Sequence, residues 1–175
     1  MSDDISDLAS VVERRLHGER DIWRKGFDAI VVDLKSKFAN GGGASASSAY
    51  QKELHRLCAG ELHRRSILTV DALLSEHKNL SESPRDTVTA KCKDWLSLRI
   101  AEEAAELEVH LRSSGPALSG PGAGDSLDDS RRTETDRVST HVDSYMGQLR
   151  RERTERGIRR ATRVLAWLRK VLRLS

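Results

Sequence analysis

The chain of 175 residues has little of what a β-rich, disulfide-bonded or membrane-spanning protein needs. Phe, Trp and Tyr together make up 4% of it, and it holds two cysteines and three prolines. It contains no convincing run of β-branched residues, and no stretch approaches the roughly 18 consecutive apolar residues of a membrane-spanning helix. Charged residues instead make up 33% of the chain. This balance is typical of long, well-solvated helices.

The two cysteines, Cys58 and Cys92, each lie on the apolar side of a helical segment. They form no CxxC motif and have no nearby histidine pair, so we expect two buried thiols and no zinc site. The acidic N-terminal stretch MSDDISDLAS lacks the order of a secretory signal peptide. We therefore expect a soluble, cytoplasmic protein without metal or cofactor.

The first helix is predicted over residues 3–38, because its apolar residues recur with a period of eleven. Eleven residues in three turns is about 3.67 residues per turn, close to a straight helix, so one face stays aligned along the whole length. The apolar residues form three rows, the third interrupted at Glu19: Ile5, Leu16, Phe27 and Phe38; Val12, Trp23 and Leu34; Leu8 and Ile30.

Two further helices are predicted over residues 49–78 and 85–112, each preceded by a turn segment rich in Gly and Ser or containing Pro. The earlier of the two carries two apolar faces, which is typical of a helix sandwiched between neighbours. The later one carries one apolar stripe, which becomes acidic after Arg99. In residues 49–78, the first apolar face holds Tyr50, Leu54, Leu57, Cys58, Leu68 and Ala72, and the second holds Ile67, Val70 and Leu74. In residues 85–112, the stripe holds Val88, Cys92, Trp95 and Leu96.

The composition then changes to Gly, Ser, Pro and Asp over residues 113–130, which predicts a flexible linker. A fourth helical region follows over residues 131–174, with a coiled-coil-like stripe at Val138, Val142, Tyr145 and Leu149. The sequence thus predicts an all-α protein of long antiparallel helices. Residues 1–112 would form a three-helix bundle, and residues 131–175 a basic helical arm.

An acidic motif, EExxE, lies at Glu102, Glu103 and Glu106 and places three carboxylates on one side of a helix. It resembles part of the acidic motif of all-α nucleoside-triphosphate pyrophosphohydrolases, which implies Mg²⁺ held by oxygen ligands. Those enzymes complete the ion site with a second acidic helix. Here the next acidic residues fall in the glycine-rich segment 113–130. The alternative is a solvated face with Arg99–Glu103 and Glu108–Arg112 ion pairs at helical spacing.

Arg56 and His63 lie seven residues apart and therefore share a helix face. The pair resembles the arginine and histidine with which the helical HEPN ribonucleases bind and cleave RNA. The HEPN motif has a polar residue directly after the arginine, whereas this chain has Leu57. The alternative is a pair of exposed polar residues on a charged helix.

The last twenty residues, RGIRRATRVLAWLRKVLRLS, carry seven positive charges and no negative charge. At about 100° per residue, their apolar side chains form a wide arc and their basic side chains fill the opposite side. This pattern indicates a basic amphipathic helix. Its candidate interaction residues are Arg159, Arg160, Arg163, Leu165, Trp167, Leu168, Arg169, Lys170, Leu172 and Arg173.

These features favour a non-catalytic interaction or scaffold subunit, with no catalytic residues assigned. Its basic arm would dock onto an acidic surface, with a partner protein or self-association expected first and nucleic acid or an anionic membrane as alternatives. A small subunit that binds nucleic acid without sequence preference is the second hypothesis, and the pyrophosphohydrolase-like enzyme is the third. The apolar arc could instead complete the protein's own bundle, with the arginines in solvent.

Overall fold

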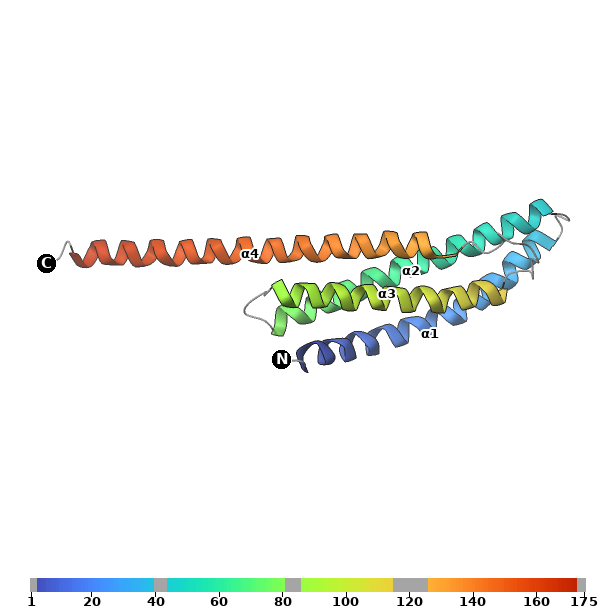
Figure 1. Cartoon of the computed structure of the whole chain (residues 1–175), viewed down its shortest axis with the longest axis horizontal. Coiled ribbons are helices and arrows are strands. Elements are labelled where there is room, and N and C mark those ends of the chain that lie inside the picture. The colour runs from blue at the N-terminus through green and yellow to red at the C-terminus, as the bar shows by residue number, and fades with distance from the viewer. Residues whose placement is uncertain (1–2, 40–43, 81–85, 115–125, 173–175) are drawn as a thin grey trace.

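A computed structural model gives four long helices, and successive helices run in opposite directions (Figure 1). They are α1 (Asp3–Ala39), α2 (Ala44–Leu80), α3 (Asp86–Ser114) and α4 (Asp128–Leu172). The structure describes the backbone of residues 3–39, 44–80, 86–114 and 126–172, and side chains within 9–39, 47–75, 90–114 and 126–166. No strand occurs among these residues, so the predicted all-α bundle of antiparallel helices is confirmed.

The helix bounds differ from the predicted ones mainly at two places. Helix α2 begins at Ala44, inside the predicted turn, and α4 begins at Asp128 and continues without interruption through Gly157. A single exposed glycine costs a helix about 1 kcal/mol, which is too little to break one of 45 residues. The rest of the predicted turns and linker, residues 40–43, 81–85 and 115–125, lies outside the described residues.

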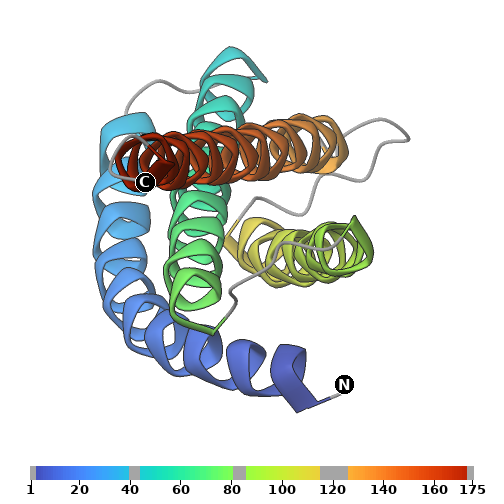
Figure 2. The ribbon, with the colours of Figure 1, turned by 90° about the vertical axis from the view of Figure 1, so that its left-hand side faces the viewer.

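Helix α2 is the centre of the bundle, since it packs against α1, α3 and α4 (Figure 2). The predicted sandwich is confirmed by burial on both of its apolar faces, where Leu54 and Cys58 are buried on one and Val70 and Leu74 on the other. The exception on the second apolar face of α2 is Ile67, whose side chain is 40% exposed. Helices α3 and α4 also pack together.

The apolar rows of α1 supply one side of the core. Val12, Leu16, Phe27 and Leu34 are buried, while Trp23 and Phe38 are partly buried and pack against the core; Val31 is buried as well. Ile30 differs from the prediction, because its side chain is 43% exposed. The apolar row that Glu19 interrupts therefore does not reach the core at Ile30. The side chains of Ile5 and Leu8 lie outside those described.

Both cysteines are buried free thiols, as predicted. Burial raises the pKa of Cys58 to about 12, because a thiolate would lose its hydration there, and the same desolvation raises the pKa of Cys92. Both thiols are therefore neutral at physiological pH and pack as small apolar side chains.

The start of helix α4 is attached to α3. Leu127 is fully buried, and its backbone N–H donates to Oε1 of Glu108 on α3 over 3.1 Å. Ser126 Oγ accepts from the N–H of Asp128 over 3.2 Å, and Asp128 and Asp129 place negative charge in the first turn. The final residues of segment 113–130 thus belong to the folded body.

The two halves of α4 lie in different surroundings. In the first half, Val138, Val142 and Met146 are buried in the same core as α1–α3, and Tyr145 and Leu149 pack against it. The second half of the helix extends past the ends of the other three (Figure 1). The transition from packed to projecting helix therefore lies near Leu149 and not within residues 113–130. The predicted division of the chain into a bundle of residues 1–112 and an arm of residues 131–175 stays a prediction.

Candidate functional site

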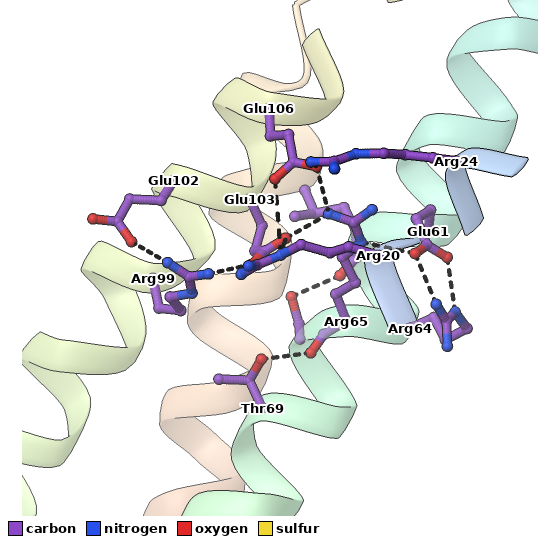
Figure 3. A network of polar contacts seen from close by, with 12 residues as sticks. Arg20, Arg24, Glu61, Arg64, Arg65, Thr69, Arg99, Glu102, Glu103 and Glu106 are labelled. Carbon is purple, nitrogen blue, oxygen red and sulfur yellow. Dashed lines mark hydrogen bonds and ion pairs between the residues drawn. The ribbon is translucent and has the colours of Figure 1, made fainter. Parts of the chain in front are cut away.

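A buried network of ion pairs joins α1, α2 and α3 around Arg65 (Figure 3). The Arg65 side chain is completely buried and donates from Nε to Glu61 over 2.7 Å and from Nη1 to Glu103 over 2.6 Å. Its guanidinium carbon lies 5.2 Å from the centroid of the Trp23 ring. Burial lowers the pKa of Arg65, but its bonds to Glu61 and Glu103 outweigh this effect and raise the pKa. Arg65 is therefore a permanent buried cation.

The EExxE carboxylates all pair with arginines. Glu103 is 3% exposed and binds Arg20 of α1 and Arg99 of α3 as well as Arg65. Glu106 pairs with Arg24 over 2.9 Å, and Glu102 pairs with Arg99 over 2.6 Å. The positive charge around Glu103 opposes binding of a divalent cation there. Among the described residues, no group of three His, Cys, Asp or Glu side chains is placed to hold a metal ion.

The predicted ion pairs Arg99–Glu103 and Glu108–Arg112 are present, at 2.9 and 2.8 Å. The accompanying prediction of a solvated face is wrong for Glu103, because arginines from two other helices cover it. Burying charges costs desolvation energy that pairing offsets only when every partner is in place. We therefore expect the network to disfavour shifted registers of α1, α2 and α3.

Arg56 and His63 have separate partners. Arg56 is exposed and pairs with Glu53 on its own helix, which lowers the pKa of Glu53. The Nδ1 atom of His63 lies 2.9 Å from Oε2 of Glu134 on α4, and Glu134 also pairs with Arg137. His63 thus takes part in attaching α4 to α2, a contact that the spacing within one helix could not reveal.

The first half of α4 is fixed to the body by further polar contacts. Lys93 on α3 pairs with Asp143 over 2.6 Å. The Tyr145 hydroxyl donates to the carbonyl oxygen of Leu74 on α2 over 3.3 Å. Together with the buried Val138, Val142 and Met146, these contacts hold residues 128–149 against α2 and α3.

The second half of α4 has no such cover. Every side chain from residue 153 to residue 166 is exposed, including Ile158 at 60%, Val164 at 55% and Leu165 at 56%. Three aliphatic side chains with more than half of their area in water thus lie within one short stretch of helix. We call residues 150–172, the second half of the helix, the projecting half of α4.

Net charge changes along α4 at the same place as burial does. Residues 131–149 hold three Lys or Arg and three Asp or Glu, so they are neutral overall. Residues 150–175 hold ten Lys or Arg and two Asp or Glu, a net charge of +8. The two acidic residues, Glu152 and Glu155, pair with Arg156 and Arg159 along the helix, and beyond Glu155 the sequence contains no acidic residue.

The structure places four of the predicted interaction residues on this exposed surface: Arg159, Arg160, Arg163 and Leu165. The side chains of the others, Trp167, Leu168, Arg169, Lys170, Leu172 and Arg173, lie outside those described. At about 100° per residue, Ile158, Ala161, Val164 and Leu165 lie within about 120° of one another. Arg159 and Arg163 lie on the opposite side of the helix.

Comparisons of the chain with protein-family models, with curated proteins and with solved structures find no match. In the part of the chain that the structure describes, no helix is long and apolar enough to cross a membrane. The chemistry of the projecting half of α4 is thus the feature from which a function has to be inferred.

Proposed function

We propose that this protein is a non-catalytic interaction subunit whose projecting half of α4 docks onto an acidic surface. The observation that carries the proposal is the combination of exposed Ile158, Val164 and Leu165 with a net charge of +7 over residues 150–172 of a helix that leaves the body. A solvated helix needs charge but gains nothing from a ridge of aliphatic side chains. A helix that completes its own core would bury that ridge.

The packed body supports this role by holding the helix in place. Residues 128–149 attach α4 through buried apolar side chains and through contacts at His63, Lys93 and Leu74. The projecting half therefore continues from a rigid base as one helix. Such an arrangement fixes the direction of the docking surface, so less conformational freedom is lost on binding than from a disordered tail.

A second candidate function, binding nucleic acid without sequence preference, is favoured by the arginines. Arg159, Arg160 and Arg163 are exposed, and a guanidinium group can bind a phosphate through two parallel hydrogen bonds. Phosphate contact of this kind predicts an affinity that falls steeply with salt.

The proposal is tested by binding to three acidic probes: anionic phospholipid vesicles, double-stranded DNA and polyglutamate. Each would be titrated in about 50 mM and about 300 mM NaCl, because salt shortens the range of charge attraction. We expect at least one probe to bind more tightly at low salt. The triple variant Arg159→Gln, Arg160→Gln, Arg163→Gln should weaken that binding.

A control variant removes the same charge from the body, through Arg14→Gln, Arg15→Gln and Arg132→Gln. All three of these side chains are exposed. This control should bind nearly as well as the unmodified chain. Equal losses in the two triple variants would mean that net charge alone drives binding. Absence of binding to all three probes would contradict the proposed function.

A further inference from the structure

We infer that the acidic surface is an anionic phospholipid membrane, and that the projecting half of α4 lies in the plane of its interface. The inference rests on the proposed function, because it names the partner of the same surface. Its basis is the distribution of apolar and basic side chains around the helix, taken together with the position of the helix outside the bundle.

The apolar arc is wide enough for an interface and wider than one helix–helix contact needs. Ile158, Ala161, Val164 and Leu165 cover about 120° of the helix circumference. In the sequence, Leu168, Val171 and Leu172 fall within the same sector and extend it to about 140°. A coiled-coil seam uses a narrower stripe, whereas an interfacial helix buries a broad apolar face about 5–10 Å deep at the boundary of headgroups and acyl chains.

The position of the arginines separates a membrane from a single partner helix. Arg159 and Arg163 lie on the side of the helix opposite the apolar arc, so a helix packed on the arc could not reach their guanidinium groups. The negative potential of an anionic bilayer decays over a Debye length of about 8–10 Å, which is close to the diameter of a helix. All basic side chains around the helix would therefore be attracted to a bilayer that holds the arc.

The other occupants use only part of this surface. The phosphates of a nucleic acid can pair with Arg159, Arg160 and Arg163 but leave Val164 and Leu165 in water. A second copy of the same helix could cover the apolar arc, but each copy brings a charge of +8 over residues 150–175. Like charges at that density oppose pairing. An anionic bilayer complements both the apolar and the basic side.

The shape of the molecule lets the helix lie flat on a surface. From residue 153 to residue 166 every side chain is exposed, and Figure 1 shows this part of α4 beyond the ends of α1, α2 and α3. Residues 153–172 extend for about 30 Å at 1.5 Å per residue. The stretch RRERTER, residues 150–156, has no apolar side chain and separates the arc from the packed half. The body can therefore remain in water while the arc is immersed.

The test is co-sedimentation of the full chain with phosphatidylcholine vesicles that contain either no phosphatidylserine or about 30% of it. We expect binding to the anionic vesicles only. Leu165→Glu should reduce the partition coefficient at least about tenfold, because it places a charge in the apolar arc. The matched control is Leu98→Glu on α3, since Leu98 is 61% exposed on the body and Leu165 is 56% exposed. This control should bind as the unmodified chain does.

The charge requirement is tested with Arg159→Gln, Arg160→Gln, Arg163→Gln on the same vesicles. A basic residue at the surface of an anionic membrane contributes about a fivefold factor, and this factor falls within a Debye length. Because Arg159 and Arg163 lie on the far side of the helix, the triple variant should lose on the order of tenfold in partition coefficient. Circular dichroism of every variant checks that the helices persist. The substituted side chains are exposed, so we expect no change in helicity.

Immersion of the arc is tested with an environment-sensitive fluorophore on Ala161→Cys, within the arc, and on Ser144→Cys, exposed on the packed half. The native Cys58 and Cys92 are buried, and burial raises the pKa of both thiols, so the engineered thiol reacts first. Anionic vesicles should shift the emission of the label at residue 161 to the blue and leave the label at residue 144 unchanged.

Four outcomes would overturn the membrane inference. Binding to DNA or polyglutamate without binding to vesicles would overturn it while the proposed function stands, whereas binding to none of the probes would overturn both. Equal binding to neutral and anionic vesicles would contradict the role of charge. Vesicle binding that Leu165→Glu leaves unchanged, with no blue shift at residue 161, would mean that the arc is not immersed.

Discussion

Residues 131–149 and residues 150–172 belong to the same helix, yet the first stretch is neutral and the second carries a net charge of +7. Val142 in the first half is completely buried, whereas Val164 in the second half is 55% exposed. The same type of side chain, on the same helix, thus meets a core in one place and water in the other. Apolar periodicity alone predicts an amphipathic helix, but the neighbouring helices decide whether its apolar face becomes core or interaction surface.

The largest expected effect is the loss of folding stability when a buried arginine, in contrast to an exposed one, is replaced. Arg65→Ala removes the cation that lies between Glu61 and Glu103, which leaves two buried carboxylates without their shared partner. Breaking a buried ion pair typically costs about 3–5 kcal/mol, so the free energy of unfolding should fall by that amount. Denaturant unfolding followed by circular dichroism measures it.

The control for this substitution is Arg163→Ala, at an exposed position of the projecting half. It should change the free energy of unfolding by less than about 0.5 kcal/mol, the range of ordinary surface substitutions. If Arg65→Ala cost no more than Arg163→Ala, the network would contribute no net stability and its proposed effect on helix register would have to be abandoned.

A smaller effect is expected from one substitution made in both halves of α4. Val142→Ala opens a cavity in the core that α4 shares with the other helices, and should cost about 1–3 kcal/mol. Val164→Ala removes the same atoms from an exposed side chain, and should cost less than about 0.5 kcal/mol. Equal losses at the two positions, measured by denaturant unfolding, would show that the projecting half is also packed.

A last effect is confined to alkaline pH. The pKa of Cys58 is about 12 in the folded chain and near 9.0 without burial, so between these values the unfolded chain loses a proton that the folded chain keeps. Stability should therefore be complete below about pH 9 and fall as the pH rises toward 12, at no more than about 1.4 kcal/mol per pH unit from this thiol.

Cys58→Ala supplies the comparison for this pH dependence, because alanine does not titrate. Its stability will be lower at neutral pH, since the sulfur is removed from the core, but it should decline less steeply above pH 9 than that of the unmodified chain. Parallel pH profiles of the two proteins would mean that Cys58 is accessible to solvent in the folded state.

The regular core was predictable from the sequence because it depends on periodicity within each helix. Leu16 and Phe27 lie eleven residues apart in α1 and are both buried, and Val138 and Val142 form the expected stripe of α4. These positions follow from the geometry of one helix, whatever its partners are.

The buried network was not predictable in the same way, because it depends on how three helices are aligned. Glu103 occupies the acidic end of the α3 stripe, and only the arrival of Arg20 and Arg65 from other helices makes it a buried residue. A related signal lies at the edge of the network: Glu19 interrupts an apolar row, and in the structure this partly exposed residue pairs with Arg64 of α2 over 2.6 Å. An acidic residue within an otherwise apolar row can mark a contact with a basic residue elsewhere.

The central claim, that one helix is core in its first half and docking surface in its second, is tested most directly by hydrogen–deuterium exchange along α4. In the isolated chain, amides around residues 138–149 should be strongly protected and those of 153–166 should exchange much faster, since only the first stretch is packed. Anionic vesicles should raise protection in residues 153–166 and leave residues 138–149 unchanged. Equal protection of both stretches in the isolated chain, with no change on adding vesicles, would contradict the account.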